Sequence, residues 1–544
     1  MLFCDLATPL KGGACFCCWP VALLLVQATQ TLGAPVALNP NLQLRLLLNT
    51  TNASGSASIR IVKDPLTNDL FYSKFNGDIY RVTVRPGTGT STSTKLYDAA
   101  NHGIADSAQG MAIGPDGTIY LVGNFTTNGG NSTFARIVKG VPGSTGERVW
   151  SILAQTEAYP RSRTAFDHVF NGIIASPDGN WIFINSGSRT DHGEVQDVGG
   201  LFPDTREVAL TAKIFRLPAN ASNLLLPNDD NALRSAGYIF AEGTRNSFDF
   251  AFAPNGDLFA TENGPDRDMS DELNWLRQGL HFGFPWRIGG ADNPQQFPDY
   301  DPANDLLLDP RFVGVGGGYY HNDPSFPPRP ANLLEPVVNV GPDADKFRDP
   351  ATGQIKDASE LGQTLSTFTA HRSPLGLVFD TAGAMDLPFR NHGFMLSFTR
   401  GDPNGNSVPG PFFDASQDLV DLELSKLGDT NYQARVTKLV GGFSTPIDAE
   451  IIANRIYVLE YSGNQGLWEI TFPPAHVTLT NPMFQSSTFK FTISGAIPGL
   501  EYQIQASTNL MSWTSLTNVV ATNNTVQFTD TTANSTRFYR ALQL

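Results

Sequence analysis

The sequence predicts an all-β protein, a six-bladed β-propeller followed by a small C-terminal β-sandwich module. Three observations support this fold class. Only 16% of the 544 residues are charged, while 51 are glycine and 37 are proline, so turns are frequent and long surface helices are few. A turn-and-strand motif recurs along most of the chain. After Pro473-Pro474 the composition changes to a stretch rich in threonine, serine and asparagine.

The recurring motif is a short turn followed by an alternating β-rich run. Asp-Gly and Asn-Gly pairs supply the positive φ angles of tight hairpin turns, and the run after each turn is typical of a strand. One blade cannot cover its own apolar faces, whereas stacked blades can, so six copies predict a six-bladed propeller. The alternative is a set of unrelated hairpins in a β-sandwich array. The copies start at Asn68, Gly114, Ser176, Ala253, Arg390 and Ala453.

The fourth and fifth copies are separated by a much longer interval, roughly residues 265–370. This interval is rich in proline, glycine and aspartate, so we expect loops there that build a site over one face of the propeller. Residues 35–474 are assigned to the propeller. Residues 475–544 show the alternation of several short strands and are assigned to the β-sandwich module, with an outer strand set of the propeller as the alternative.

The N-terminal residues resemble a secretory signal peptide, which we assign to residues 1–34, so the protein is expected to be secreted or periplasmic. Cys4, Cys15, Cys17 and Cys18 are the four cysteines of the chain, so residues 19–544 can form no disulfide or cysteine-based zinc site. The net charge of −15 argues against nucleic acid as a partner. No stretch predicts a membrane span.

Two polar motifs precede successive repeat strands and therefore share one end of the propeller. His168, next to Asp167, lies ahead of the strand at residues 172–175, and Arg245 lies ahead of the strand at residues 248–252. A histidine can act as a base near neutral pH, and an arginine can stabilise a developing anion. The alternatives are a polar loop histidine and an inter-blade salt bridge.

The segment from Thr261 to Asn274 carries five acidic residues among turn formers. Hard oxygen ligands, including the backbone carbonyls at Gly264-Pro265, suit Ca²⁺. A solvated acidic loop is the alternative. The ligand register excludes an EF-hand.

In combination these residues resemble the glucose/sorbosone dehydrogenase family, soluble six-bladed propeller enzymes that use pyrroloquinoline quinone (PQQ) and Ca²⁺. The resemblance covers roughly residues 55–470 and is most specific over residues 243–286. It rests on the following segments: Gly243-Thr244-Arg245-Asn246, Ala253-Pro254-Asn255-Gly256-Asp257-Leu258-Phe259, Glu262-Asn263-Gly264-Pro265, Asp271-Glu272-Leu273-Asn274, Gly283-Phe284-Pro285-Trp286 and His371-Arg372-Ser373-Pro374-Leu375-Gly376-Leu377-Val378-Phe379.

The resemblance implies a role for each matching residue. His168 matches the general base that takes the proton of a sugar's anomeric hydroxyl, and Asp167 matches the neighbour that orients it. Arg245 matches the residue that faces the quinone oxygen, and Asn246 a cofactor contact. The pair Gly264 and Pro265 matches the carbonyls that hold the cofactor's Ca²⁺. Asp271 and Glu272 resemble part of a structural Ca²⁺ cluster.

Three positions depart from the family pattern. The family's pair of cofactor-binding arginines is absent from the stretch at residues 442–448. A cofactor-binding lysine is expected in the fifth blade, where only Arg400 is a candidate. Gln109 is a looser match to a first-blade glutamine. Because PQQ is a tricarboxylate, the loss of cations weakens its site.

The sequence therefore favours an exported PQQ- and Ca²⁺-dependent aldose dehydrogenase, with a sugar as substrate and an unidentified electron acceptor. The first alternative is a non-catalytic propeller that binds carbohydrate or protein and uses Ca²⁺ structurally. The second is a Ca²⁺-dependent lactonase, which needs a metal held by carboxylates on the propeller axis.

Overall fold

The structure is a computed structural model that describes residues 34–52, 55–85, 91–144, 146–400, 412–474, 476–485, 488–531 and 537–543. The predicted signal peptide, with all four cysteines, lies outside the described residues except for residue 34.

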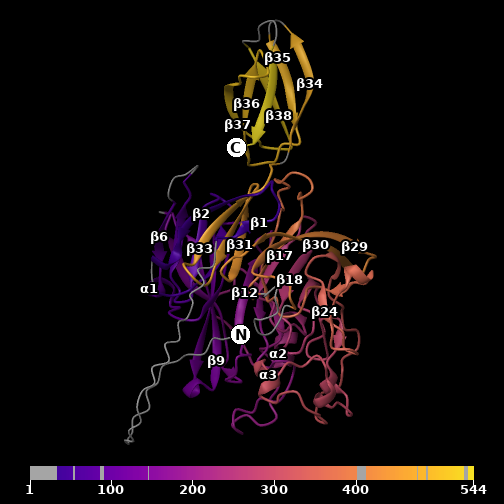
Figure 1. The fold of residues 1–544 in the computed structure, drawn as a ribbon. Helices are drawn as coiled ribbons and strands as arrows, with labels where there is room; N and C mark the ends of the chain where they lie inside the picture. The colour runs from indigo at the N-terminus through magenta and orange to yellow at the C-terminus, as the bar shows by residue number, and fades with distance from the viewer. Residues whose placement is uncertain are drawn as a thin grey trace, which may run out of the picture.

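Six sheets form the propeller that the repeats predict, and the strands that make up each blade pair in antiparallel fashion (Figure 1). Blades one to three contain β3 (Ser58–Lys63), β4 (Leu70–Lys74), β5 (Ile79–Thr83) and β6 (Thr92–Tyr97); β7 (Ala108–Ile113), β8 (Ile119–Thr127), β9 (Ser132–Pro142) and β10 (Arg148–Thr156); and β12 (Phe170–Ala175), β13 (Trp181–Ser186), β14 (Lys213–Pro218) and β16 (Ile239–Glu242). Blades four to six contain β17 (Asp249–Phe252), β18 (Leu258–Glu262) and β19 (Glu272–Leu276); β27 (Pro374–Phe379), β28 (Gly393–Ser397), β29 (Asp418–Leu427) and β30 (Asn431–Gly441); and β31 (Pro446–Ile452), β32 (Arg455–Glu460), β33 (Gly466–Thr471) and β2 (Gln43–Asn49).

Each of the six sequence motifs forms the turn between the first and second strands of one blade. Gly117, Gly179 and Gly256 adopt φ angles of 81°, 71° and 86° in three of these turns, a conformation that favours glycine. All six turns therefore lie on one face of the propeller, which we call the turn face. The first strands begin on the opposite face, which we call the entry face.

The first strands β3, β7, β12, β17, β27 and β31 lie side by side in a closed ring. The ring is closed by chain segments from both ends of the propeller, because the early strand β2 pairs with β33 in blade six. This pairing joins the two ends of the propeller through backbone hydrogen bonds, with β2 as the outermost strand of blade six.

The long interval between the fourth and fifth motifs carries insertions, as expected. It contains short elements that precede blade five, and blade four has only three strands among the described residues. Two of its strands extend blade five, where β23 pairs with β30 and with β26. The strands and the α-helix of the interval are β20 (Leu280–His281), β21 (Arg287–Ile288), β22 (Ala291–Asp292), α3 (Val313–Gly316), β23 (Val338–Pro342), β24 (Lys346–Arg348), β25 (Ile355–Asp357) and β26 (Leu365–Ser366). Its 3₁₀ helices are η3 (Pro294–Gln296), η4 (Pro302–Asn304) and η5 (Ser359–Leu361).

The remaining short elements lie around blades one to three and five. They are α1 (Ala99–His102), β11 (Tyr159–Pro160), β15 (Leu224–Leu226), α2 (Asp230–Ser235) and β1 (Val36–Ala37).

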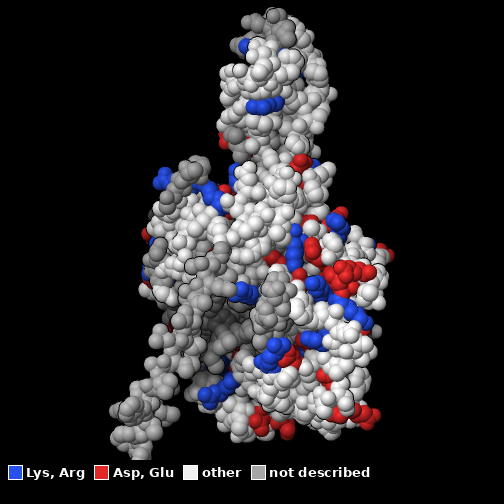
Figure 2. All heavy atoms as spheres, in the orientation of Figure 1, with Lys and Arg blue, Asp and Glu red and all other residues white. Residues whose placement is uncertain are grey.

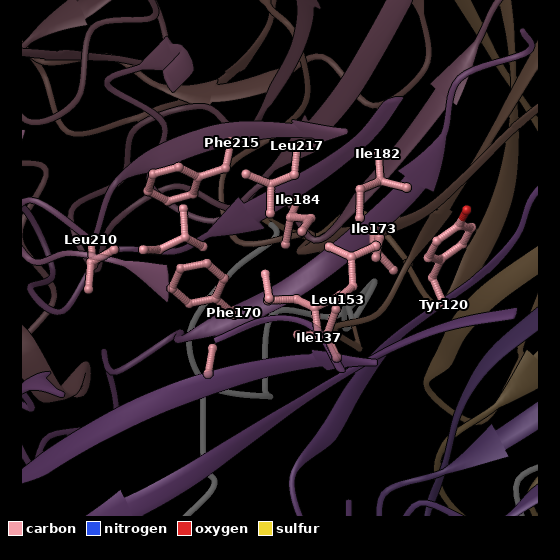
Figure 3. Close-up of a cluster of buried hydrophobic side chains, with 14 of the residues drawn as sticks. Tyr120, Ile137, Leu153, Phe170, Ile173, Ile182, Ile184, Leu210, Phe215 and Leu217 are labelled. Carbon is pink, nitrogen blue, oxygen red and sulfur yellow. The ribbon is translucent and has the colours of Figure 1, made fainter. Parts of the chain in front are cut away.

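The hydrophobic core lies between adjacent blades rather than in one central mass. Figure 3 shows the cluster between blades two and three, where Leu153 and Ile137 of one blade face Phe170 and Ile184 of the next. Phe170 stacks on Phe215 with ring centroids 5.6 Å apart. Burial of the apolar blade faces therefore depends on neighbouring blades, as in other repeat folds.

The C-terminal strands form two three-stranded sheets that enclose their own core. Pro473 accepts a hydrogen bond from the Asp386 backbone amide (2.8 Å), on the connection between β27 and β28, so the module joins the turn face. In Figure 2 its visible face carries few charged side chains compared with the propeller. The strands are β34 (Thr478–Gln485), β35 (Thr488–Ser494), β38 (Thr525–Asp530) and β37 (Thr514–Val520), β36 (Glu501–Ser507), β39 (Phe538–Gln543).

None of the helices in the described parts of the chain has the length and apolar character needed to cross a bilayer.

Candidate active site

His168 lies on the entry face, directly before β12. Its backbone amide donates to the carbonyl oxygen of Ser188 (3.0 Å), and its Nδ1 lies 3.2 Å from both that oxygen and the Ser188 hydroxyl. The Ser188 hydroxyl donates its own proton to the Thr190 carbonyl (2.8 Å), so both neighbours of Nδ1 are acceptors. Nδ1 therefore carries the proton of the neutral imidazole, and Nε2 has a free lone pair.

The surroundings of His168 also favour the neutral form. Burial among protein atoms lowers the pKa of His168 well below its usual value, and the nearby Arg245 guanidinium lowers it further. The side chain is nevertheless partly exposed to solvent. A neutral imidazole with a free Nε2 can accept a proton from a ligand at physiological pH.

Asp167 forms its hydrogen bonds and ion pair with residues other than His168. Its carboxylate accepts hydrogen bonds from the backbone amides of Ser162 (2.7 Å) and Arg163 (2.8 Å) and pairs with Arg161 at 3.4 Å. The structure thus gives Asp167 the role of fixing the loop that carries His168. The Ser188 contacts described above orient the ring instead.

Arg245 is only 4% exposed and makes three side-chain hydrogen bonds. Its Nε donates to the Asp191 carbonyl (2.7 Å), Nη2 to the Asp191 carboxylate (2.9 Å) and Nη1 to the Asn263 carbonyl (3.3 Å). The carboxylate of Asp191 is fully buried and balances the guanidinium charge. Arg245 is therefore held in an ion pair with Asp191. Its positive charge is already neutralised by Asp191 when an anion approaches.

His168, Arg245 and Asn246 meet around Gly187. A Cβ atom on Gly187 would lie 2.3 Å from the Cβ of His168 and 3.3 Å from both the Arg245 carbonyl oxygen and Asn246 Oδ1. The Ser188 amide donates to the Arg245 carbonyl (2.7 Å), which links the two segments. The structure thus places the predicted base and arginine on either side of one strand end, as their equivalent positions in the repeat indicate.

Asn246 belongs to a buried chain of amides beneath the same loop. Its Oδ1 accepts from Asn171 (2.7 Å), and its Nδ2 donates to Asn263 Oδ1 (3.1 Å). These contacts join the beginning of blade three to blade four. Both polar atoms of the Asn246 side chain thus form hydrogen bonds within the protein.

Gln109 and Arg400 come from blades two and five. Gln109, at the start of β7, donates to the Ser107 hydroxyl (3.3 Å). Arg400 is exposed and follows Thr399, whose hydroxyl donates to the Ser373 hydroxyl (3.1 Å). Arg400 thus belongs to the entry face of blade five, two blades away from His168.

The proposed metal ligands divide into two kinds. Gly264 and Pro265 present carbonyl oxygens that accept no hydrogen bond within the described residues. Asp271 uses both carboxylate oxygens, which accept from the amides of Gly264 (2.6 Å) and Ser373 (2.9 Å). The two carbonyl oxygens are therefore left available to a ligand, whereas Asp271 holds two loops together.

Glu272 is buried directly opposite Glu262 in the register of β18 and β19. Its carboxylate accepts from the Gly289 amide (2.6 Å) and from Asn274 (2.8 Å). Burial raises the pKa of Glu272 to about 7. Burial, with the neighbouring Glu272, raises the pKa of Glu262 well above its usual value. Within the ranges that the structure describes, no cluster of three or more acidic, histidine or cysteine side chains has metal-binding geometry.

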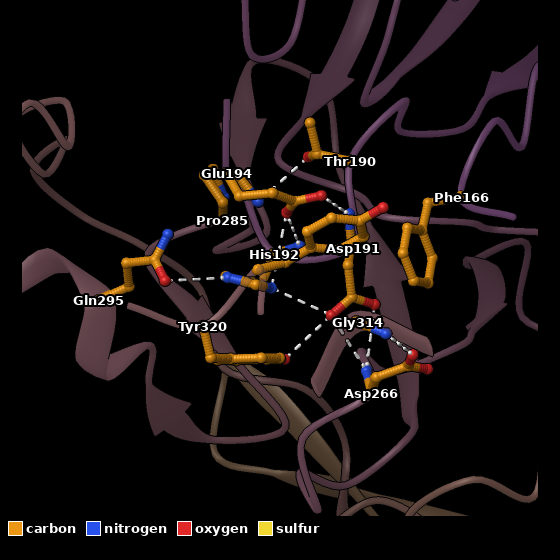
Figure 4. Close-up of polar contacts among 12 residues, drawn as sticks. Phe166, Thr190, Asp191, His192, Glu194, Asp266, Pro285, Gln295, Gly314 and Tyr320 are labelled. Carbon is orange, nitrogen blue, oxygen red and sulfur yellow. Dashed lines mark hydrogen bonds and ion pairs between the residues drawn. The ribbon is translucent and has the colours of Figure 1, made fainter. Parts of the chain in front are cut away.

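Next to Arg245 lies a polar cluster that sequence reasoning missed (Figure 4). Asp191, His192 and Glu194 are at most 1% exposed, and Tyr320 packs flat on the His192 ring with centroids 3.7 Å apart. The one available signal was the Asp191-His192 pair after a repeat strand, which repeats the residue types of Asp167-His168. Its partners come from residues up to 129 positions away, which no local pattern reveals.

The propeller axis carries an arginine. Arg60 of β3 donates to the carbonyls of Gln109 (2.9 Å) and Phe248 (2.5 Å) and pairs with Asp249 at 3.5 Å. Burial raises the pKa of Asp249 to about 6 and that of Asp448 well above its usual value. The charge of Arg60 therefore opposes a cation held by these carboxylates, which the lactonase alternative requires.

Comparison with known proteins supports the predicted resemblance. The sequence model of the family described as Glucose / Sorbosone dehydrogenase matches residues 62–310. A quinoprotein glucose dehydrogenase B from Acinetobacter calcoaceticus is 34% identical over 82 residues, which are 15% of this chain and 16% of that protein. The aligned segment thus spans much less than two thirds of that relative.

Several solved structures are similar in fold. A glucose dehydrogenase is 14% identical with a TM-score of 0.48, covering 79% of this chain and 99% of its own. The soluble aldose sugar dehydrogenase from Escherichia coli, in its apo form, is 15% identical with a TM-score of 0.47, covering 79% and 99%. A PQQ-bound aldose sugar dehydrogenase from Streptomyces coelicolor is 16% identical with a TM-score of 0.43, covering 80% and 99%. At these values the structural likeness carries no functional argument.

The family match includes the segments of His168, Arg245 and Gly264-Pro265, and this chain therefore resembles the glucose/sorbosone dehydrogenase family over residues 62–310.

Proposed function

We propose that this protein oxidises the anomeric hydroxyl of an aldose, with PQQ as hydride acceptor and Ca²⁺ as the cofactor's metal. The observation that carries the proposal is the setting of His168, whose Nδ1 lies 3.2 Å from two acceptors and whose Nε2 has no hydrogen-bond partner among the described residues. The family match over residues 62–310 supports the choice of substrate class and cofactor.

The described residues fit the cofactor in part. The Gly264 and Pro265 carbonyl oxygens are suitable ligands for Ca²⁺, and His168 lies beside Arg245 at the entry face. The fit to three carboxylates is poorer, because Asp191 already balances Arg245 and residues 442–448 contain no arginine. We therefore infer weak cofactor binding, with Arg400 as a further candidate cation.

When bound, PQQ with Ca²⁺ would supply a two-electron acceptor for the hydride of the sugar's anomeric carbon. The protein supplies the base. His168 Nε2 takes the hydroxyl proton, and the Ser188 carbonyl and hydroxyl hold the resulting imidazolium through Nδ1. The lowered pKa of His168 keeps Nε2 unprotonated before substrate arrives, and Arg245 fixes the loop after β13 that carries Asp191.

A titration tests the proposal directly. Purified protein is titrated with PQQ and Ca²⁺ while quinone absorbance is followed, and dye reduction is then measured with a panel of aldoses. We expect saturable absorbance changes and dye reduction with at least one aldose. No absorbance change and no dye reduction at saturating PQQ and Ca²⁺ would reject the enzyme proposal.

A non-catalytic carbohydrate-binding propeller is the second candidate. The observation that favours it is the charge balance of Arg245 with Asp191, together with the missing arginine pair. Calorimetry of the protein with the same aldoses, without PQQ, distinguishes the two. Sugar binding without cofactor binding would favour this second candidate.

We also propose that the protein is exported, on the basis of the apolar segment within residues 1–34. Fractionation of expressing cells and N-terminal sequencing of the mature protein test this. A cytoplasmic product that retains residue 1 would contradict the proposal.

A further inference from the structure

Asp191 is the centre of a hydrogen-bonded group that surrounds Arg245. Its Oδ1 accepts from Arg245 Nη2 (2.9 Å), and its Oδ2 accepts from the Tyr320 hydroxyl (3.0 Å). The Asp266 amide donates to both oxygens at 3.1 and 3.2 Å. Asp191 thus connects the loop after β13 with the insertion that contains Tyr320.

Both ring nitrogens of the neighbouring His192 face hydrogen-bond acceptors. Nδ1 lies 3.0 Å from Asp191 Oδ2 and 3.5 Å from Glu194 Oε2, and Nε2 lies 3.1 Å from Gln295 Oε1. The His321 backbone amide donates to the same Gln295 oxygen (3.0 Å). An amide can only donate, so it fixes the oxygen of Gln295 toward His192.

Because both nitrogens must donate, the His192 ring must carry two protons. We propose that His192 is a permanent buried imidazolium that positions Arg245 through Asp191, a role that rests on the proposed function of this site. Figure 4 shows the ring between Gln295 on one side and the Asp191 and Glu194 carboxylates on the other.

The charges around the ring agree with a cation. Burial alone lowers the pKa of His192, but the Glu194 carboxylate and the hydrogen bond with Asp191 outweigh it and raise the pKa. Tyr320 stacks on the ring at 16° between planes, an arrangement that also stabilises a cation. Arg245 and His192 both pair with Asp191, and His192 also lies 3.5 Å from Glu194. The Asp266 carboxylate beside Asp191 adds a further buried acid, and Arg189 interacts with Glu194.

The imidazolium explains how the fully buried Asp191 carboxylate can stay ionised and hold Arg245 in place. Without the imidazolium, Asp191 would keep Arg245 as its ion-pair partner but lose its contact with a second cation, beside the buried Asp266 carboxylate, which is costly. The loop would rearrange, and the two contacts that Asp191 gives to Nε and Nη2 of Arg245 would weaken. His192 is thus a positioning residue that touches neither substrate nor cofactor.

Nitrogen NMR of the unmodified protein tests the protonation state. The chain has eight histidines, so selective ¹⁵N-histidine labelling gives few signals. We expect the His192 ring to keep two protonated nitrogens from pH 7 to pH 9, and its signals should vanish in His192→Gln. An unprotonated ring nitrogen on His192 at pH 7 would overturn the proposal. If His192→Gln does not fold, Gln295→Leu identifies the ring through a shift of its Nε2 signal.

A double-mutant cycle with Arg245→Lys tests the positioning role. His192→Gln is expected to lower kcat about tenfold or more in the wild-type background and less than threefold in the Arg245→Lys background. Equal losses in both backgrounds would overturn the role. The matched control is His392→Gln in blade five, where His392 Nδ1 lies 3.0 Å from the Asp421 carboxylate. It removes another histidine–aspartate pair and should leave kcat unchanged.

The same cycle on thermal unfolding separates this inference from the proposed function. If the wild type shows no aldose-dependent dye reduction, the proposed function fails, while the Tm losses still report coupling. We expect the Tm loss of the double variant to be smaller than the sum of the single losses. Additive losses would count against coupling between His192 and Arg245.

Discussion

Gly187 holds His168 in place through its lack of a side chain, and Gly187→Ala tests this. The added Cβ would lie 2.3 Å from the Cβ of His168. Gly187 has no positive φ, so alanine meets no backbone restriction there. The perturbation is therefore purely steric and acts on the segment that carries the proposed base.

The size of the effect follows from that distance. Two carbon atoms in contact lie about 3.5–4.0 Å apart, so relief of the clash requires a shift of about 1 Å or more. The opposite neighbours, the Arg245 carbonyl and Asn246 Oδ1 at 3.3 Å, limit movement of Gly187 itself. A displacement of about 1 Å at a reacting group can cost about 10²-fold in rate. We expect kcat to fall by about that factor and overpacking to destabilise the protein by about 1–3 kcal/mol.

Dye-reduction kinetics at saturating PQQ and Ca²⁺ measure the effect. The matched control is Gly393→Ala in β28, where an added Cβ would lie 2.6 Å from the Phe379 ring, far from His168 in the chain. The control should lose stability and keep kcat. Full kcat in Gly187→Ala, or an equal loss in both variants, would refute the reasoning.

Three further predictions concern charge, catalysis and metal. Burial lowers the pKa of Lys74 from 10.5 to about 8, so the folded state binds fewer protons than the unfolded state between these pH values. Lys74→Met should therefore raise the free energy of unfolding by up to about 3 kcal/mol at pH 7, less the contribution of the hydrogen bonds that Lys74 makes. At pH 9.5 the gain should fall to about 1.4 kcal/mol, as denaturant unfolding can measure. A gain that is independent of pH would contradict this. His168→Ala should lower turnover about 10²–10⁴-fold with PQQ binding nearly intact, whereas Arg245→Ala should lower both, as absorbance titration can show. Removal of Ca²⁺ by EDTA from calcium-containing protein should lower Tm, because a ligand at a hundredfold excess over its Kd stabilises by about 2.7 kcal/mol; an unchanged Tm would exclude binding.

The propeller could be predicted because its signal is local. Each motif pairs a turn that needs a positive φ with a run of alternating residues, and Gly117, Gly179 and Gly256 adopt the expected angles. The closing of blade six by β2 could not be predicted. Residues 43–49 carry no turn motif, and their pairing with β33 is set only when the ring closes.

Only the positions of the candidate site residues relative to the repeat could be predicted from the sequence. His168 and Arg245 precede equivalent strands, so the repeat alone places them on one face. Their partners were not predictable, because the Ser188 and Asp191 contacts come from a loop that folds back over the entry face. The insertion with Tyr320 adds contacts across 129 positions, which depend on tertiary packing.

Acidic residues show most clearly what a sequence pattern leaves open. Asp167 and Asp271 match positions of a base partner and a metal ligand, yet each carboxylate accepts two backbone amides and thereby fixes loops. Asp191, which no motif singled out, is the carboxylate that balances Arg245. A buried carboxylate is stable only when donors or cations satisfy it, and those partners follow from the folded loops. Cofactor affinity at this site therefore depends on how much charge Asp191 leaves on Arg245, which the cycle with His192 measures.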